Sequence, residues 1–329
     1  MRNRSLYLGL IISLTPVIML GSLMFGGVTL PLVDILAFDD EVIRKIILDI
    51  RIPRMLLAFL AGGGLALAGL NYQILFQNPL ATPFTLGIAS GAALGAASVI
   101  IFNLSYTVFF VSTVNIGAFV GGLIALLFLY LVAICWNLSS ITGLLLAGVA
   151  LSFIFSSLNT ALHYIADYNQ VYMIVRWLMG KIVTFGYQDI VIVLFFVTTL
   201  FLITLFYSSE LDLFLSGETI ATTRGVKIKA VRNIILIMTS LTVGAIVSLT
   251  GPIAFVGMMA PHIVRLVIGY QTKFLMVGTF FFGGILLVIS DIVAKTVIAP
   301  AEIPVGIVTS LLGGPFFLWL LKRKVGCYH

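Results

Sequence analysis

The sequence predicts an all-α polytopic membrane protein with about ten transmembrane helices and both termini in the cytoplasm. Of its 329 residues, 61% are hydrophobic and only 9% are charged, whereas a soluble domain carries roughly 25% charged residues. The apolar residues form runs of about 20, the length that crosses a bilayer core. Such runs suit helices rather than the short alternating strands of a barrel. We therefore expect residues 1–329 to form a single transmembrane domain.

Ten apolar runs define the expected spans. In chain order they are 6–26, 53–76, 83–103, 107–135, 141–165, 189–208, 229–250, 254–269, 273–294 and 303–321. The first follows Arg2 and Arg4 as a signal peptide would, but no A-x-A-like cleavage site comes after it, so we interpret it as a retained span. The fourth is long enough to be tilted or broken, and the eighth is short and contains Pro261.

Basic residues set the orientation of these spans. With the N-terminus inside, eleven of the 18 Lys and Arg residues fall on the cytoplasmic side, as the positive-inside rule requires. The net charge of +6 is therefore interpreted as a mark of cytoplasmic loops and not of a nucleic-acid partner. Cys135 and Cys327 lie far apart in the sequence, so we do not expect them to form a disulfide or a metal-binding pair.

Small residues predict close packing between helices. Gly87, Gly91 and Gly95 recur every four residues, which places them on one face of the third span. Tight packing against a neighbouring backbone is the simplest interpretation, and a glycine-lined pathway is the alternative.

The motifs of several enzyme classes are absent from the sequence. There is no G-x-x-x-x-G-K-[ST] loop for ATP and no H-E-x-x-H, and the three histidines share no metal spacing. Asp291 is the clearest acid inside a span, which by itself suggests a functional group. Lys295 follows it by four residues, so an ion pair on one helix face is the simpler expectation. We expect no catalytic residues, no bound metal and no bound cofactor.

Four stretches, taken together and in order, carry a resemblance to a known family. They are Arg51-Ile52-Pro53-Arg54; Gln77-Asn78-Pro79-Leu80-Ala81 with 85–92; 251–257 with 260–265; and 302–309 with 313–317. The chain resembles the FecCD/BtuC-like permease subunits of ABC importers for ferric siderophores, haem and cobalamin. The resemblance covers about residues 50–322 and implies the BtuC-like (type II importer) fold, whose ten spans with both termini inside equal the number expected above.

The resemblance implies a transport subunit of the bacterial cytoplasmic (inner) membrane, and not an enzyme. Its partners would be a second permease subunit, identical or paralogous, two ATP-binding subunits that use ATP and Mg, and a periplasmic or lipid-anchored substrate-binding protein. The favoured cargo is a ferric siderophore of the catecholate type, with haem or cobalamin as alternatives. An ion-coupled secondary carrier is the rival class, although no inverted repeat is visible.

The cytoplasmic segment 209–228 is expected to couple the chain to its ATPase. In the family this loop folds into short helices that dock in a cleft of the ATP-binding subunit. The matching candidates here are Leu213, Phe214, Gly217, Glu218, Arg224 and Gly225. Apolar and charged residues alternate in a way that suits a partner surface with a polar rim. A helix lying on lipid is the alternative.

Two further sets of residues follow from the resemblance. Arg51, Arg54 and Lys295 match basic positions that receive acidic residues of the binding protein; anchoring of the second span at lipid headgroups is the alternative for the two arginines. The pathway would run along the dimer axis, lined by the fifth and tenth spans, with a cytoplasmic gate at Ser139, Ser140, Ile141 and Thr142. Those four could instead simply begin a helix. Segment 168–184 is expected to form a short outer helix at the mouth of the pathway.

Overall fold

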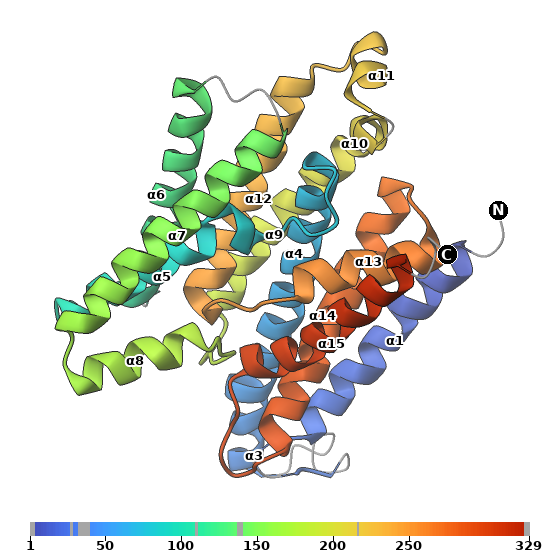
Figure 1. The fold of residues 1–329 in the computed structure, drawn as a ribbon. Helices are drawn as coiled ribbons and strands as arrows, with labels where there is room; N and C mark the ends of the chain where they lie inside the picture. Colours follow the sequence, from blue (N-terminus) through green and yellow to red (C-terminus); the bar gives the residue numbers. More distant parts are fainter. Residues whose placement is uncertain are drawn as a thin grey trace.

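The computed structural model describes residues 4–26, 29–31, 40–108, 111–136, 141–215 and 217–325, and this part of the chain is almost entirely helical (Figure 1). Seven helices are long and apolar enough to cross a membrane. They are α1 (Arg4–Met24), α4 (Ile52–Leu75), α6 (Thr113–Cys135), α7 (Ile141–Ile165), α9 (Gln188–Phe206), α12 (Ile228–Thr250) and α14 (Thr272–Thr296). Three shorter apolar helices accompany them: α5 (Ile88–Ile101), α13 (Val256–Ile268) and α15 (Val305–Val325).

Each expected span coincides with one of these helices, including the short α13 with Pro261 inside it. The all-α polytopic architecture is thereby confirmed. The number of crossings and the side on which the termini lie stay predictions.

Short elements lie at the two ends of the helical bundle. At one end are α3 (Glu41–Lys45), the π-helical η1 (Ile46–Arg51) that continues into α4, and α8 (Tyr168–Leu178), which lies across the ends of longer helices in Figure 1. At the opposite end are α10 (Ser208–Leu215) and α11 (Glu218–Thr223). The predicted orientation makes the first end the outer one and the second the inner one. The predicted short helices in 168–184 and 209–228 are both present.

The predicted fourth span begins later than expected. Residues of β1 (Thr107–Val108) pair antiparallel with β2 (Val111–Ser112), and α6 starts only at Thr113. The Ser112 side chain accepts a hydrogen bond from the Val114 backbone N–H at 3.3 Å and so caps the helix. This N-cap fixes the start of α6 at Thr113, inside the apolar run, and hydropathy alone cannot detect such a start.

Helix α4 forms the centre of the bundle and packs against α14 and α13 through glycines. A Cβ on Gly62 would collide with the Gly283 carbonyl of α14, and one on Gly284 would lie 2.9 Å from the Phe59 carbonyl oxygen. A Cβ on Gly69 would overlap the Gly257 backbone of α13. Backbones can approach this closely only where side chains are absent.

The α5–α6 contact confirms two of the three predicted packing glycines. Gly91 and Gly95 face Gly121 and Gly117 of α6, with backbone atoms where side chains would be. Gly87 was predicted to share this face, and that prediction is wrong. It lies before α5 with φ +80°, at the end of the 3-10 helix η2 (Pro83–Leu86), where the left-handed conformation favours glycine.

Substitution of Gly69 by alanine should destabilise the protein by about 1–3 kcal/mol, because the methyl group would overlap a backbone that cannot move aside cheaply. Thermal unfolding in detergent measures the effect. Gly244→Ala is the matched control: it also lies in a buried helix, but its Cβ would be 3.6 Å from the Phe119 ring, an ordinary contact. Equal melting temperatures for the two variants would contradict this packing.

Candidate coupling, docking and pathway sites

The outer end of α4 and α14 carries a buried cluster of charges. Arg54 Nε and Nη2 donate to Asp291 Oδ1 at 3.1 and 2.9 Å, and Lys295 Nζ lies 3.0 Å from Asp291 Oδ2 as an ion pair. Arg54 Nη1 donates to both carboxylate oxygens of Glu302 at 2.9 Å. The side chain of Asp291 is 1% exposed and that of Lys295 8%, whereas Glu302 is 42% exposed.

The cluster confirms the predicted pair of Asp291 with Lys295 and adds two members. Its charges come from α4, α14 and the segment before α15, so it fastens three parts of the chain together. Glu302 was missed as a functional residue, although it stands in one of the motif stretches. Nothing in the sequence indicates that its partner is Arg54, 248 residues away.

Arg51 lies beside this cluster but bonds elsewhere. Its guanidinium donates to the carbonyl oxygens of Leu23 and Met24, at the last turn of α1. Helix C-termini carry unpaired carbonyl groups and a partial negative charge, so an arginine is a favourable neighbour there. The three predicted docking residues are thus brought to one end of the bundle, and all three have partners within the chain.

The predicted coupling segment is firmly seated on the inner ends of α4 and α14. Leu211 and Phe214 are fully buried in the core of the chain itself. The Asp212 Oδ1 atom accepts a hydrogen bond from the Thr272 backbone N–H at 2.8 Å, at the start of α14. Gln77 Nε2, just beyond α4, donates to the Phe214 carbonyl oxygen at 2.9 Å.

The exposed face of this segment differs from the predicted one. Phe214 points inward and Leu213 is half-buried, whereas Leu215 and Ile220 are 38% and 49% exposed. Arg224 and Gly225 are exposed as expected, and the side chain of Glu218 lies outside the described residues. The sequence could not show this, because both faces of the segment contain large apolar side chains.

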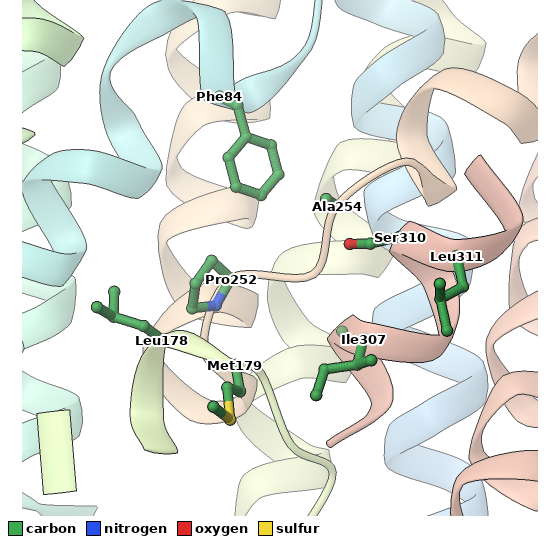
Figure 2. A pocket seen from close by; sticks show the side chains of 9 residues that line it. Phe84, Leu178, Met179, Pro252, Ala254, Ile307, Ser310 and Leu311 are labelled. Carbon is green, nitrogen blue, oxygen red and sulfur yellow. The ribbon is translucent and has the colours of Figure 1, made fainter. Parts of the chain in front are cut away.

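A cavity of about 440 Å3 opens between α8, α15 and the segment that joins α12 to α13 (Figure 2). Its lining consists of Phe84, Leu178, Met179, Pro252, Ala254, Gly306, Ile307, Ser310 and Leu311. Ser310 supplies the only side-chain polar group of this lining, and Figure 2 shows the Ile307, Ser310 and Leu311 side chains on consecutive turns of α15. The cavity can hold an apolar-surfaced group and offers no charge to retain one.

Two glycines, Gly180 and Gly251, are the chain neighbours of the lining residues Met179 and Pro252. Gly180 and Gly251 have φ +69°, and the Lys181 backbone N–H donates to the Thr250 carbonyl at 2.7 Å. A Cβ on Gly180 would lie 2.6 Å from the Pro252 carbonyl oxygen, so both the conformation and the space favour glycine.

The predicted gate is only partly described by the structure. Ser139 and Ser140 lie outside the described residues, as does the side chain of Ile141, whose backbone begins α7 together with Thr142. Helix α15 lines the cavity, and α7 supplies none of its lining. That the fifth and tenth spans line the pathway stays a prediction. Among the described residues, no group of three or more His, Cys, Asp or Glu side chains is placed to hold a metal ion.

Comparison with known proteins now adds to this geometry. The model of the FecCD transport family matches residues 14–323, nearly the whole chain. The chain belongs to the FecCD transport family. It is thus the permease subunit of an ABC transporter and a multi-pass protein of the inner membrane, and ATP hydrolysis belongs to a separate subunit.

Relatives in the FecCD family differ in their cargo. The chain is 34% identical to the hemin transport system permease HmuU of Yersinia pestis, over 97% of this chain and 96% of the relative. It is 36% identical to an iron chelatin transport permease of Helicobacter pylori, over 85% of this chain and 83% of the relative. It is 34% identical to the vitamin B12 permease BtuC of Vibrio vulnificus, over 85% and 84%.

The fold itself is shared with a solved structure. A metal-chelate type ABC transporter in an inward-facing conformation superimposes with a TM-score of 0.87 and 30% identity, covering 96% of this chain and 99% of that one. The structure of PsaBC from Streptococcus pneumoniae matches less closely, with a TM-score of 0.55 and 18% identity over 81% and 88%, and shows the common fold alone.

Proposed function

We propose that this FecCD permease imports a ferric siderophore of the catecholate type, driven by ATP hydrolysis in a partner subunit. The observation that carries the proposal is the family match along residues 14–323. The apolar cavity supports an organic chelate as cargo, because a metal wrapped in an organic ligand can pass a wall without charged groups. A molybdate permease of Haemophilus influenzae is also 35% identical, so molybdate is one of the cargoes that the uptake experiment must compare.

Haem is the second candidate cargo. The hemin permease of Yersinia pestis aligns with 97% of this chain, and a porphyrin is also largely apolar. Cobalamin stands third, on the vitamin B12 permease relative. A common apolar path would explain why one fold serves all three, with selection made by the external binding protein.

The cargo is tested by uptake into proteoliposomes that contain this chain, its genomically neighbouring ATPase and its binding protein. Radiolabelled ferric catecholate, haemin, cobalamin and molybdate are offered separately, with ATP inside. The proposal expects ATP-dependent uptake of the ferric catecholate. ATP-dependent uptake of haemin or cobalamin alone would replace the cargo while keeping the importer, and uptake of none of the four would overturn the proposed function.

The working assembly would contain two permease subunits, identical or paralogous, two ATP-binding subunits and one external binding protein. The pathway would run between the permease subunits, beside α7 and α15, with its inner gate near residues 139–142. On the inner side, Leu215 and Ile220 would enter the ATPase cleft, with the basic Arg224 at the rim. Their exposure supports this, because an apolar pair surrounded by polar groups is typical of a partner surface.

The binding protein would dock over Arg51, Arg54 and Lys295 by exchanging carboxylates. Arg54 is 14% exposed and already pairs with Glu302, which stands at the surface with 42% of its side chain exposed. An acidic residue of the binding protein could therefore reach Arg54 only by displacing Glu302. Asp291 would remain in place below and keep both cations oriented.

Glu302→Gln should strengthen binding of the external protein, about three- to tenfold, because a neutral amide competes less well for Arg54 than a carboxylate does. Affinity is measured between the detergent-solubilised permease and its binding protein, at low and at physiological salt. Asp189→Asn is a matched control, since this acid lies outside the cluster and accepts a hydrogen bond from Thr184 Oγ1 at 2.9 Å. If the Glu302→Gln permease binds the external protein with unchanged affinity, the cluster has a structural role only.

A further inference from the structure

Helices α4 and α14 connect the two functional ends of the molecule. They contain 24 and 25 residues, so each is about 36 Å long, slightly more than a bilayer core. They run side by side in opposite directions through the bundle in Figure 1, and their backbones approach each other at Gly62 and Gly283. The Phe59 ring meets the Phe280 ring edge-on at 5.6 Å beside this contact.

Both ends of this helix pair are tied by polar bonds. At the outer end, Arg54 of α4 and Lys295 of α14 share the Asp291 carboxylate. At the inner end, α10 is bonded to both helices, to α14 through Asp212 and to the end of α4 through Gln77. One of these inner bonds uses a side chain of the coupling segment, Asp212, and the other uses Gln77, two residues beyond the end of α4.

The pair also lies in the buried part of the bundle. In the most apolar 18 residues of each candidate span, 89% are buried for the span containing α4, 67% for α12 and 56% for α14, but only 22% for α7. A densely packed pair whose backbones approach each other at Gly62 and Gly283 has little freedom to deform, because interiors switch between discrete packings and do not stretch. A displacement at one end is then passed to the other as a rigid movement.

We infer that α4 and α14 act as a rigid strut, with Asp212 and Gln77 as the positioning residues through which α10 moves it. Motion of the ATPase would reach the Arg54 cluster along this strut, while access would change at helices outside the pair. This inference rests on the proposed function, since it requires that α10 and α11 receive the ATPase. It assigns roles to Asp212 and Gln77, which were not among the coupling candidates predicted from the sequence.

The first test measures distances by pulsed electron paramagnetic resonance in the assembled transporter, with Cys135 and Cys327 replaced by serine. Labels are placed at Ser209 of α10 and Val297 just after α14, both exposed. A second pair joins Ser209 to Tyr164 near the outer end of α7, which is 91% exposed. Labelled subunits are diluted with unlabelled ones so that distances between two copies do not contribute.

Vanadate trapping with ATP is expected to change the Ser209–Val297 distance by less than roughly 2 Å, the size of an ordinary helix shift. The Ser209–Tyr164 distance is expected to change by more than this. A Ser209–Val297 change as large as the Ser209–Tyr164 change overturns the inference. Failure of the ATPase to bind the permease at all would instead refute the proposed function, and the two results are distinguishable by co-purification.

The second test measures cargo molecules imported per ATP hydrolysed. Asp212→Ala and Gln77→Glu should each lower this ratio about tenfold, the effect expected from losing one hydrogen bond that involves a charged or buried partner, while ATP hydrolysis continues. Asp212→Asn keeps an oxygen acceptor for the Thr272 N–H and should retain most of the ratio. A merely structural role would lower assembly and ATPase activity together; an unchanged ratio in both Asp212→Ala and Gln77→Glu overturns the inference.

Discussion

Replacing Asp291 by alanine is expected to destabilise the protein by about 3–5 kcal/mol, because it leaves two buried cations without their shared carboxylate. Arg54 would keep Glu302 at the surface, but Lys295, whose side chain is 8% exposed, would lose the acid that it contacts in this structure. The cluster is the only link by side-chain ion pairs between α4 and α14 among the described residues. We expect the variant to melt well below the wild-type protein in detergent.

Two comparisons isolate the effect of the buried charge. Glu302→Gln removes the other acid that pairs with Arg54, at a half-exposed position where an ion pair contributes roughly 0–1 kcal/mol. The melting temperature of this variant should therefore change little. Asp291→Ala combined with Lys295→Met should recover part of the loss, since the unpaired ammonium group is then absent. An Asp291→Ala variant as stable as Glu302→Gln would show that the cluster does not hold the outer ends together.

Replacing Ile220 by glutamate is expected to weaken binding of the ATPase about 30-fold or more. The side chain is 49% exposed at the inner end, and a charge placed in the apolar centre of an interface removes a contact of the kind that contributes 2 kcal/mol or more. Binding of the ATP-binding subunit to the solubilised permease gives the affinity directly. Leu215→Glu, at the end of the preceding helix α10, should act in the same direction.

Leu104→Glu is the matched control for this prediction. Leu104 has the same exposed fraction, 49%, and lies beyond α5 near the outer strands. The same change of apolar side chain to carboxylate at that end should leave ATPase affinity unaltered. If Ile220→Glu binds the ATPase as tightly as Leu104→Glu does, the exposed apolar pair is not the coupling surface.

The helices could be predicted from the sequence because lipid imposes one strong rule on the backbone. Each apolar run that was expected to be a span contains a helix, although α5 and α6 begin at Ile88 and Thr113, later than the expected residues 83 and 107. The spacing of Gly91 and Gly95 likewise indicated a close helix contact, which α6 provides. The Asp291–Lys295 pair followed from helical geometry alone.

What the sequence could not predict depends on contacts between distant segments. Arg54 was expected to bind an acidic residue of the external binding protein. In the structure it donates hydrogen bonds to Asp291 and Glu302, which lie more than 200 positions further along the chain. Phe214 was expected to face a partner, yet the fold turns it inward. In both cases residue type and local pattern fit either role, and tertiary packing decides between them.

The central claim is that ATP hydrolysis in a separate subunit drives import through this chain. The measurement that tests it most directly is ferric chelate uptake into proteoliposomes with ATP, with a non-hydrolysable ATP analogue, and with ATP plus a protonophore. We predict uptake with ATP, none with the analogue, and no loss when the protonophore removes the ion gradient. Uptake that continues without hydrolysis and stops with the protonophore would identify an ion-coupled carrier and contradict the account.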